Sequence, residues 1–169
     1  MEYLDIYDDE RNKTGQTTTR GHITNKNNNL LAVFIVVFNH EGKMLIQKRS
    51  PDKFISPGVW DLSAGGAVLS GESSFQGAYR EAMEEIGYRL DSTRKKPVFS
   101  EYYSTFIVDY YLAQTDWDLS KFKIQKEEVD EIKYCDLSEI ETLMQKKLFR
   151  EHSLNIIRLL FEINQNIKF

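Results

Sequence analysis

The chain has 169 residues, of which 41% are hydrophobic and 28% charged, a composition typical of one globular domain rather than a disordered chain. A formal net charge of −4 and a single cysteine argue against a nucleic-acid polymer as the main ligand and against an internal disulfide. The first residues are acidic where a signal peptide would be basic, and the longest apolar run (30–38) is too short to span a bilayer. We therefore expect a cytoplasmic protein that has no membrane partner.

The first part of the chain favours β-strands. Gly15 offers a positive φ to a first hairpin, which we expect as an N-terminal extension over residues 1–28. The polar turn 39–42 separates two apolar segments, as in a second hairpin. The expected elements are two short strands within 2–20, strands over 32–39 and 44–50, a loop over 51–57, and one short strand over 58–66 that ends at a glycine pair.

A helix is predicted next. Ser73 and Gln76 have capping-box spacing, and Gly87 is a natural C-terminal stop after Ile86. Apolar residues recur at helical spacing and predict a stripe that packs on the sheet. This stripe consists of Phe75, Ala78, Ala82 and Ile86.

The remaining elements complete an α+β fold. A strand pair over 97–105 and 106–114 is followed by a strand over 128–137, with Cys135 as a core residue. Helices over 137–148 and 152–165 end the chain. The order of strands, helix, strands and helices predicts an antiparallel or mixed sheet with helices packed on it, in one domain over 1–169.

The predicted helix carries an unusual density of charge. Glu81, Glu84 and Glu85 share one face beside the apolar stripe, where like charges repel. Gly77 lies one turn earlier, and we expect it to leave this face open for a ligand. Clustered carboxylates without histidine or cysteine suit Mg²⁺ or Mn²⁺ rather than zinc. Arg80 stands one turn before Glu84 and is expected to pair with it.

The spacing around this helix is more specific than the helix alone. Gly66 is followed after five residues by Glu72, after seven more by Arg80-Glu81, after two by Glu84-Glu85, and after one by Gly87. Residues 66–88 thereby resemble a complete Nudix box, with Ala82 and Tyr88 standing where larger aliphatic residues are usual. The flanking strand order also resembles the Nudix fold, which implies a mixed sheet between helices, an α/β/α sandwich.

This resemblance implies an enzyme that hydrolyses a diphosphate linkage, usually in a nucleoside diphosphate derivative, with Mg²⁺ or Mn²⁺ as cofactor. Glu81 would bind metal or act as general base, Arg80 would orient a glutamate, and Glu72 would support the site. Some family members add a carboxylate from a later loop, where Glu127 and Glu128 are candidates. The implied metal ligands are Glu81, Glu84, Glu85 and the carbonyl of Gly65; the implied catalytic residues are Glu81, Glu84, Arg80 and Glu72; the candidate substrate-binding residues are Lys48, Arg49 and Glu128.

A second resemblance leads to an alternative. Residues 45–73 are similar to isopentenyl-diphosphate isomerases, which share the Nudix fold and use a catalytic cysteine and a metal-binding histidine. Gly65 and Ala67 occupy those two positions, so the sequence resembles an isomerase-like branch that has hydrolase carboxylates. Isomerase activity and a non-catalytic nucleotide-binding module stay as alternatives. The chain is expected to act on a small-molecule diphosphate as a monomer or homodimer, with Trp60, Tyr102, Tyr103 and Tyr110 as candidates to stack a base.

Overall fold

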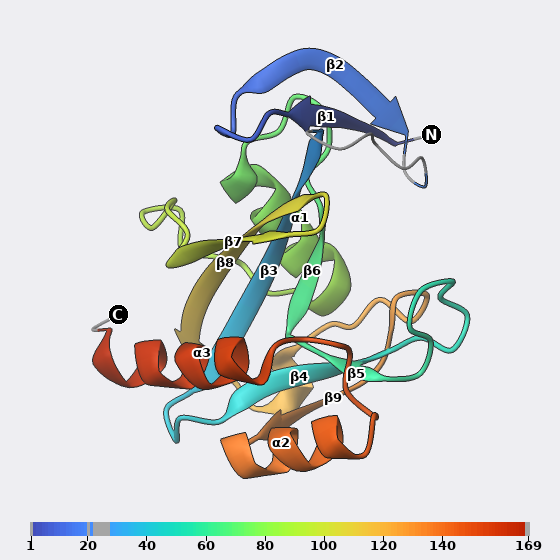
Figure 1. Ribbon diagram of the computed structural model, residues 1–169. Coiled ribbons are helices and arrows are strands. Elements are labelled where there is room, and N and C mark those ends of the chain that lie inside the picture. Colours follow the sequence, from blue (N-terminus) through green and yellow to red (C-terminus); the bar gives the residue numbers. More distant parts are fainter. Residues whose placement is uncertain (1, 20, 22–27, 168–169) are drawn as a thin grey trace.

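Within residues 2–19, 21 and 28–167, which the computed structural model describes, nine strands form one mixed sheet that lies between α-helices (Figure 1). The expected α/β/α sandwich is thereby confirmed. The strands are β1 (Tyr3–Tyr7), β2 (Lys13–Thr19), β3 (Asn29–Asn39), β4 (Met44–Arg49), β5 (Trp60–Asp61), β6 (Ala64–Ala67), β7 (Phe99–Tyr103), β8 (Phe106–Thr115) and β9 (Val129–Cys135); the helices are α1 (Ser74–Ile86), η1 (Leu119–Lys121), α2 (Leu137–Gln145) and α3 (Leu154–Asn166).

The long strand β3 organises the sheet. It pairs antiparallel with β1, β4 and β6, and parallel with β8. Side chains of a strand alternate between its two faces. Val33, Ile35 and Val37 pack in the core beneath α1, whereas Val36 and Phe38 pack in the core beneath α2 and α3. The sheet is thus buried on both faces, which explains why β3 is a nearly continuous apolar run.

Helix α1 begins and ends where the sequence predicts. Ser73 forms a capping box with Gln76, and Gly87 ends the helix with a left-handed φ of 66°. Of the predicted stripe, Ala78, Ala82 and Ile86 are fully buried and Phe75 is partly buried, all packed toward the sheet. The helix is therefore held in a fixed register over β3 and β6, and this register sets where its carboxylates lie.

The expectation of a single strand over 58–66 was wrong. The segment makes two short strands, β5 beside β4 and β6 beside β3. Ser63 lies between them, where its hydroxyl accepts a hydrogen bond from the Val37 amide (2.8 Å) and donates one to the Leu45 carbonyl (2.5 Å). The Ser63 hydroxyl thereby gives a hydrogen-bond partner to one backbone group of β3 and one of β4. The segment changes its pairing from β4 to β3 at this point without leaving these two groups unpaired.

The N-terminal strands form the predicted hairpin, but their turn lies earlier than Gly15. The turn is closed by a hydrogen bond from the Asp8 amide to the Asn12 carbonyl (3.0 Å), with Arg11 at a left-handed φ of 68°. Gly15 has the expected positive φ of 81°, but inside β2. Part of the expected extension over 1–28, residues 1, 20 and 22–27, lies outside the described residues. One domain over 1–169 stays a prediction.

A buried carboxylate joins three segments at the other end of the sheet. Asp61 on β5 is 1% exposed, and its oxygens lie 3.0 Å from Arg150 Nη1, 2.7 Å from His152 Nε2 and 3.6 Å from Arg49 Nη1. Burial by itself would raise the pKa of Asp61, but the hydrogen bond and charge of His152 and the charge of Arg150 outweigh it and lower that pKa to about 2. We call Asp61, Arg49, Arg150 and His152 the Asp61 hub.

None of the helices in the described ranges is at once long enough and apolar enough to cross a membrane.

Candidate active site

The candidate site forms where α1 crosses the glycine pair of β6. A Cβ atom on Gly66 would lie 2.3 Å from Glu81 Oε1, so the missing side chain leaves the space that this carboxylate occupies. The amide of Gly65 donates a hydrogen bond to Glu85 Oε2 (3.0 Å). Glu81 and Glu85, one turn apart on α1, thereby pack directly against the backbone of β6. The absence of side chains on Gly65 and Gly66 allows α1 to approach β6 this closely.

Glu85 is the most enclosed of these carboxylates. It is 5% exposed and also accepts a hydrogen bond from Gln47 Nε2 (2.9 Å). Burial first, and the neighbouring charge of Glu81 second, raise the pKa of Glu85 to about 8. Gln47 Oε1 is buried without a hydrogen-bond partner in the described structure. The surroundings of Glu85 therefore disfavour its ionised form and favour a cation bound beside it.

Arg80 joins the glutamates of the acidic cluster. Its guanidinium donates to both oxygens of Glu72 (2.8 and 3.0 Å), to Glu81 Oε1 (2.7 Å) and to the Ala67 carbonyl (2.9 Å). A longer contact of 3.3 Å reaches Glu84. The hydrogen bond to Glu72 and the charge of Glu81 raise the pKa of Arg80, so this cation is fixed at the centre of the cluster.

Glu72 lies just ahead of α1 and reaches back to it. Its Oε2 also accepts a hydrogen bond from the Leu69 amide (2.9 Å). Burial alone would raise the pKa of Glu72, but the hydrogen bonds from Arg80 and Leu69 lower it below the ordinary value. Arg80 and Glu72 thus form one rigid unit.

The carboxylates are not arranged as a finished metal cage. In the part of the chain that the structure describes, no three His, Cys, Asp or Glu side chains converge closely enough to hold a metal ion. The reason is visible in the contacts: Arg80 draws Glu81 and Glu84 toward itself, and the Glu84 side chain is 53% exposed. Donor chemistry nevertheless fits a hard divalent cation, because every candidate ligand is an oxygen. Binding such an ion would require Glu81 and Glu84 to turn from Arg80.

Gly77 has a different role from the one expected. It is buried, and a Cβ there would lie 2.9 Å from Val68 Cγ2. The expectation that Gly77 leaves a face open for a ligand was wrong, because Val68 already fills that face. The glycine instead lets α1 pack closely on the segment after β6.

Two of the candidate substrate-binding residues, Lys48 and Arg49, are the last residues of β4 and contact different segments. Arg49 is 8% exposed and donates to the carbonyls of Ile55 and Ser56 (3.1–3.2 Å). Lys48 Nζ lies 3.5 Å from Asp130, so its contact is on β9 rather than on α1. Their contact with a phosphate stays a prediction.

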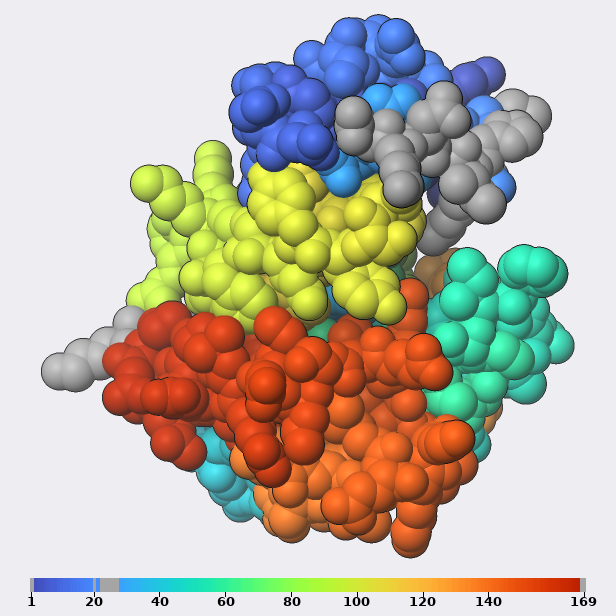
Figure 2. All heavy atoms as spheres, viewed as in Figure 1, coloured from blue at the N-terminus to red at the C-terminus, as the bar shows by residue number. Residues whose placement is uncertain are grey.

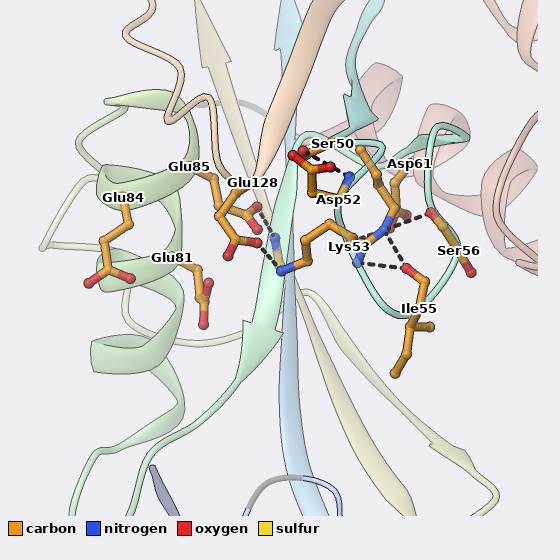
Figure 3. A network of polar contacts seen from close by, with 12 residues as sticks. Ser50, Asp52, Lys53, Ile55, Ser56, Asp61, Glu81, Glu84, Glu85 and Glu128 are labelled. Carbon is orange, nitrogen blue, oxygen red and sulfur yellow. Dashed lines mark hydrogen bonds and ion pairs between the residues drawn. The ribbon is translucent and has the colours of Figure 1, made fainter. Parts of the chain in front are cut away.

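Glu128 has a partner that sequence analysis missed. Lys53, from the loop over 50–57, forms an ion pair with it, and Figure 3 shows the lysine extending toward Glu128 between that loop and the glutamates of α1. No motif marks Lys53, because it stands in an irregular loop beside several other charges. Glu128 is tied to the helix through Gln125, whose carbonyl accepts from the Glu128 amide (2.9 Å) and whose amide donates to the Glu85 carbonyl (3.1 Å).

The four aromatic candidates for stacking a base differ in how far they are buried. Trp60 and Tyr110 are 9% and 2% exposed and belong to the core beneath α2 and α3, so they offer no face to a base. Tyr102 and Tyr103 are 58% and 60% exposed at the end of β7. A pocket of about 160 Å³ lies elsewhere, between the start of α1, residues 88–94 and β8, and none of the box glutamates lines it.

The position of the isomerase cysteine is closed. A Cβ on Gly65 would lie 2.5 Å from Phe34 Cδ1 and 2.6 Å from the Val33 carbonyl oxygen. A cysteine side chain would therefore have to displace both a packed ring and backbone. Cys135 is fully buried beside α2, which confirms that it is a core residue.

Solved structures share this architecture. A crystal structure of a Deinococcus radiodurans protein, DR0079, superposes with a TM-score of 0.79 at 20% identity, over 94% of this chain and 99% of that one. The NUDIX domain of Shewanella oneidensis NrtR, crystallised with ADP ribose, superposes with a TM-score of 0.55 at 18% identity, over 89% of this chain and 94% of that one. The fold is thus the Nudix fold.

Sequence comparison gives the family. The NUDIX domain model matches residues 28–160, so the chain belongs to the Nudix family. An uncharacterized Nudix hydrolase of Listeria monocytogenes is 38% identical over 143 residues, which cover 85% of each chain. This chain is a Nudix hydrolase, of a family that acts on diphosphate linkages and generally uses divalent cations. The isomerase-like branch stays a prediction.

Proposed function

We propose that this hydrolase is a Mg²⁺-dependent enzyme that cleaves the diphosphate linkage of a nucleoside diphosphate derivative or a related organic diphosphate. The observation that carries the proposal is the seating of Glu81 and Glu85 against Gly66 and Gly65, where a Cβ would clash at 2.3 Å and an amide donates at 3.0 Å. A helix that brings carboxylates into close contact with a glycine pair places several oxygen donors near one point, where a cation can bind to them.

Glu81, Glu84, Glu85 and the Gly65 carbonyl would hold the Mg²⁺, and Mn²⁺ has the same preference for oxygen ligands. The bound ion would neutralise phosphate charge and acidify an attacking water. Burial first, and the charge of Glu81 second, disfavour the ionised form of Glu85 and raise its pKa to about 8; a bound cation would favour that ionised form. The closed position at Gly65 argues against isomerase chemistry.

The chain's own residues position the reaction. Arg80, anchored on Glu72 at 2.8 and 3.0 Å, limits where the carboxylates of Glu81 and Glu84 can turn. Glu81, bonded to Arg80 at 2.7 Å, serves either as a metal ligand or as the group that accepts a proton from the attacking water. Glu128 is the second candidate for proton acceptor, from the turn before β9.

The substrate class follows from the family and from one neighbour. The Shewanella oneidensis NUDIX domain was crystallised with ADP ribose, a nucleoside diphosphate joined to a sugar. The exposed Tyr102 and Tyr103 offer ring faces for a base at the edge of the sheet. We propose a small-molecule diphosphate as substrate and a monomer or homodimer as the working form.

The test is hydrolysis of a defined panel: nucleoside di- and triphosphates, nucleotide sugars, ADP-ribose and isopentenyl diphosphate, each with Mg²⁺, with products identified by mass. Glu84→Gln and Glu85→Gln should abolish cleavage, and Glu162→Gln, an exposed change on α3, should not. Metal-dependent nucleotide binding without any cleavage would favour the non-catalytic module instead. Isomerisation of isopentenyl diphosphate would contradict the proposal.

A further inference from the structure

The loop between β4 and β5 is fixed at its base and exposed at its tip. The buried Arg49 guanidinium holds the carbonyls of Ile55 and Ser56, and the Ser50 amide donates to the Glu128 carbonyl (2.9 Å). Phe54 at the tip is 99% exposed and Ile55 is 60% exposed. Figure 2 shows this segment, in teal, projecting from the body of the protein. Exposed apolar side chains beside a candidate site indicate a surface that can contact a bound molecule.

Lys53 points the other way from its neighbours. Its side chain is 21% exposed and is turned inward onto Glu128, on the side of the loop that faces Glu81, Glu84 and Glu85 (Figure 3). The ammonium group therefore lies beside Glu128, between the loop and the glutamates of α1. Two cations thus flank the glutamates, one from inside the box and one from a loop outside it.

The two cations differ in how firmly they are held. Arg80 contacts Glu72, Glu81, Glu84 and the Ala67 carbonyl. Lys53 is bound through an ion pair whose partner, Glu128, has a side chain 32% exposed. A partly exposed ion pair contributes little to stability, and a lysine on a flexible stem changes partner easily. Lys53 is thus the less firmly held of these two cations.

We propose that Lys53 is a phosphate-binding residue, and that its ion pair with Glu128 is a resting contact that the substrate's diphosphate replaces. When Lys53 transfers to a phosphate oxygen, the exposed tip of the loop turns about its fixed base and brings Phe54 toward the bound molecule. Glu128 is released from the lysine in the same step, next to the glutamates of α1. This inference rests on the proposed function, because it assigns the diphosphate to the same site.

The test measures binding by calorimetry, with methylenediphosphonate as a ligand that cannot be hydrolysed, in the presence of Mg²⁺. Lys53→Met should weaken binding at least tenfold, and Lys53→Arg should restore it to within about threefold of the wild type. Glu128→Gln should strengthen binding, because it removes the competitor for Lys53. Lys43→Met, which removes the same charge from the exposed β3–β4 turn, should change nothing.

The outcomes separate the two proposals. If the wild type binds the diphosphonate, Glu85→Gln does not, and Lys53→Met binds as well as wild type, then Lys53 has no role and the proposed function stands. If Glu128→Gln weakens binding as much as Glu85→Gln, the ion pair is not a resting contact. If the wild type does not bind the diphosphonate with Mg²⁺, the proposal for Lys53 fails, and the hydrolysis panel decides the proposed function separately. The melting temperature of Lys53→Met, measured by circular dichroism, should match that of the wild type, because Lys53 lies outside the hydrophobic cores beneath α1 and beneath α2 and α3.

Discussion

Two neighbouring clusters of charge, joined through Gln47, which pairs with Asp61 across β4 and β5 and donates to Glu85, are balanced in opposite ways. In the Asp61 hub, one buried carboxylate meets Arg49, Arg150 and His152, and its pKa falls to about 2. In the site on α1, one guanidinium meets Glu72, Glu81 and Glu84 while Glu85 stands behind them with its pKa raised to about 8. The first cluster is complete in the folded chain; the second is left with excess negative charge.

The difference separates a structural network from a functional one. A buried ion whose partners are all supplied by the chain needs no ligand, and removal of one partner destabilises the fold strongly because it leaves buried charge uncompensated. A cluster left with unbalanced charge destabilises the chain until a ligand of opposite charge arrives, and perturbed groups of this kind concentrate at functional sites. Changes in the two clusters should therefore affect different measurements.

Asp61→Asn should give the largest effect, on stability. Removal of the charge leaves Arg150, His152 and Arg49 without their buried counter-ion, at a cost of about 3–5 kcal/mol. For a chain of this size the melting temperature should fall by roughly 10 °C. Asp130→Asn, which affects a half-exposed partner of Lys48, is the matched control and should change little. Equal melting of the two variants would show that the hub does not hold the fold.

Glu85→Gln should do the reverse, with activity lost and stability kept. Loss of a metal ligand should lower kcat at least about 100-fold, since even the outer partners of metal ligands are worth 10–100-fold. Above pH 8, where Glu85 of the wild type is ionised, the metal-free variant should melt at or above the wild-type temperature, because an unbalanced buried charge is removed. A metal-free Glu85→Gln protein that melts well below the wild type would refute this division of roles.

Acid should weaken the fold through Asp61. Its folded pKa of about 2 lies below the ordinary 3.8, so its contribution is fully present above pH 4 and is lost as the pH falls from about 4 toward 2. The contribution is about 2 kcal/mol. Urea unfolding of wild type and Asp61→Asn across this range should show their difference in unfolding free energy shrinking as the pH falls. A difference that stays constant would mean that the pKa of Asp61 is the same in the folded and the unfolded protein.

Gly66→Ala should give the smallest of these effects. The new Cβ would lie 2.3 Å from Glu81 Oε1, so the carboxylate must shift, and activity should fall about tenfold, or about 1.4 kcal/mol. Combining it with Glu81→Asp, which shortens the side chain, should cost less than the sum of the two single changes. Additive losses would mean that Gly66 and Glu81 act independently.

Local features were predictable from the sequence. The capping box at Ser73, the left-handed Gly87 and the apolar stripe of α1 depend on neighbouring residues, and all are confirmed. The fixed spacing of the box likewise identified which carboxylates gather on α1. Such features need only the helical repeat and the chemistry of a few side chains.

Features set by distant residues were missed. The split into β5 and β6 depends on Ser63 bonding to Val37 and Leu45, and the packing role of Gly77 depends on Val68. Lys53 pairs with a residue 75 positions away in the chain. No periodicity or spacing in the sequence records contacts of this kind, because they appear only when the sheet brings the segments together.

The most direct test of the central claim is thermal unfolding with and without Mg²⁺, in the wild type, Glu85→Gln and Asp61→Asn. If the α1 site lacks a cation, Mg²⁺ at ten times its dissociation constant should stabilise the wild type by about 1.4 kcal/mol. Asp61→Asn should gain the same increment from a lower starting temperature, and Glu85→Gln should gain none. An equal Mg²⁺ shift in Glu85→Gln, or no shift in the wild type, would contradict the account.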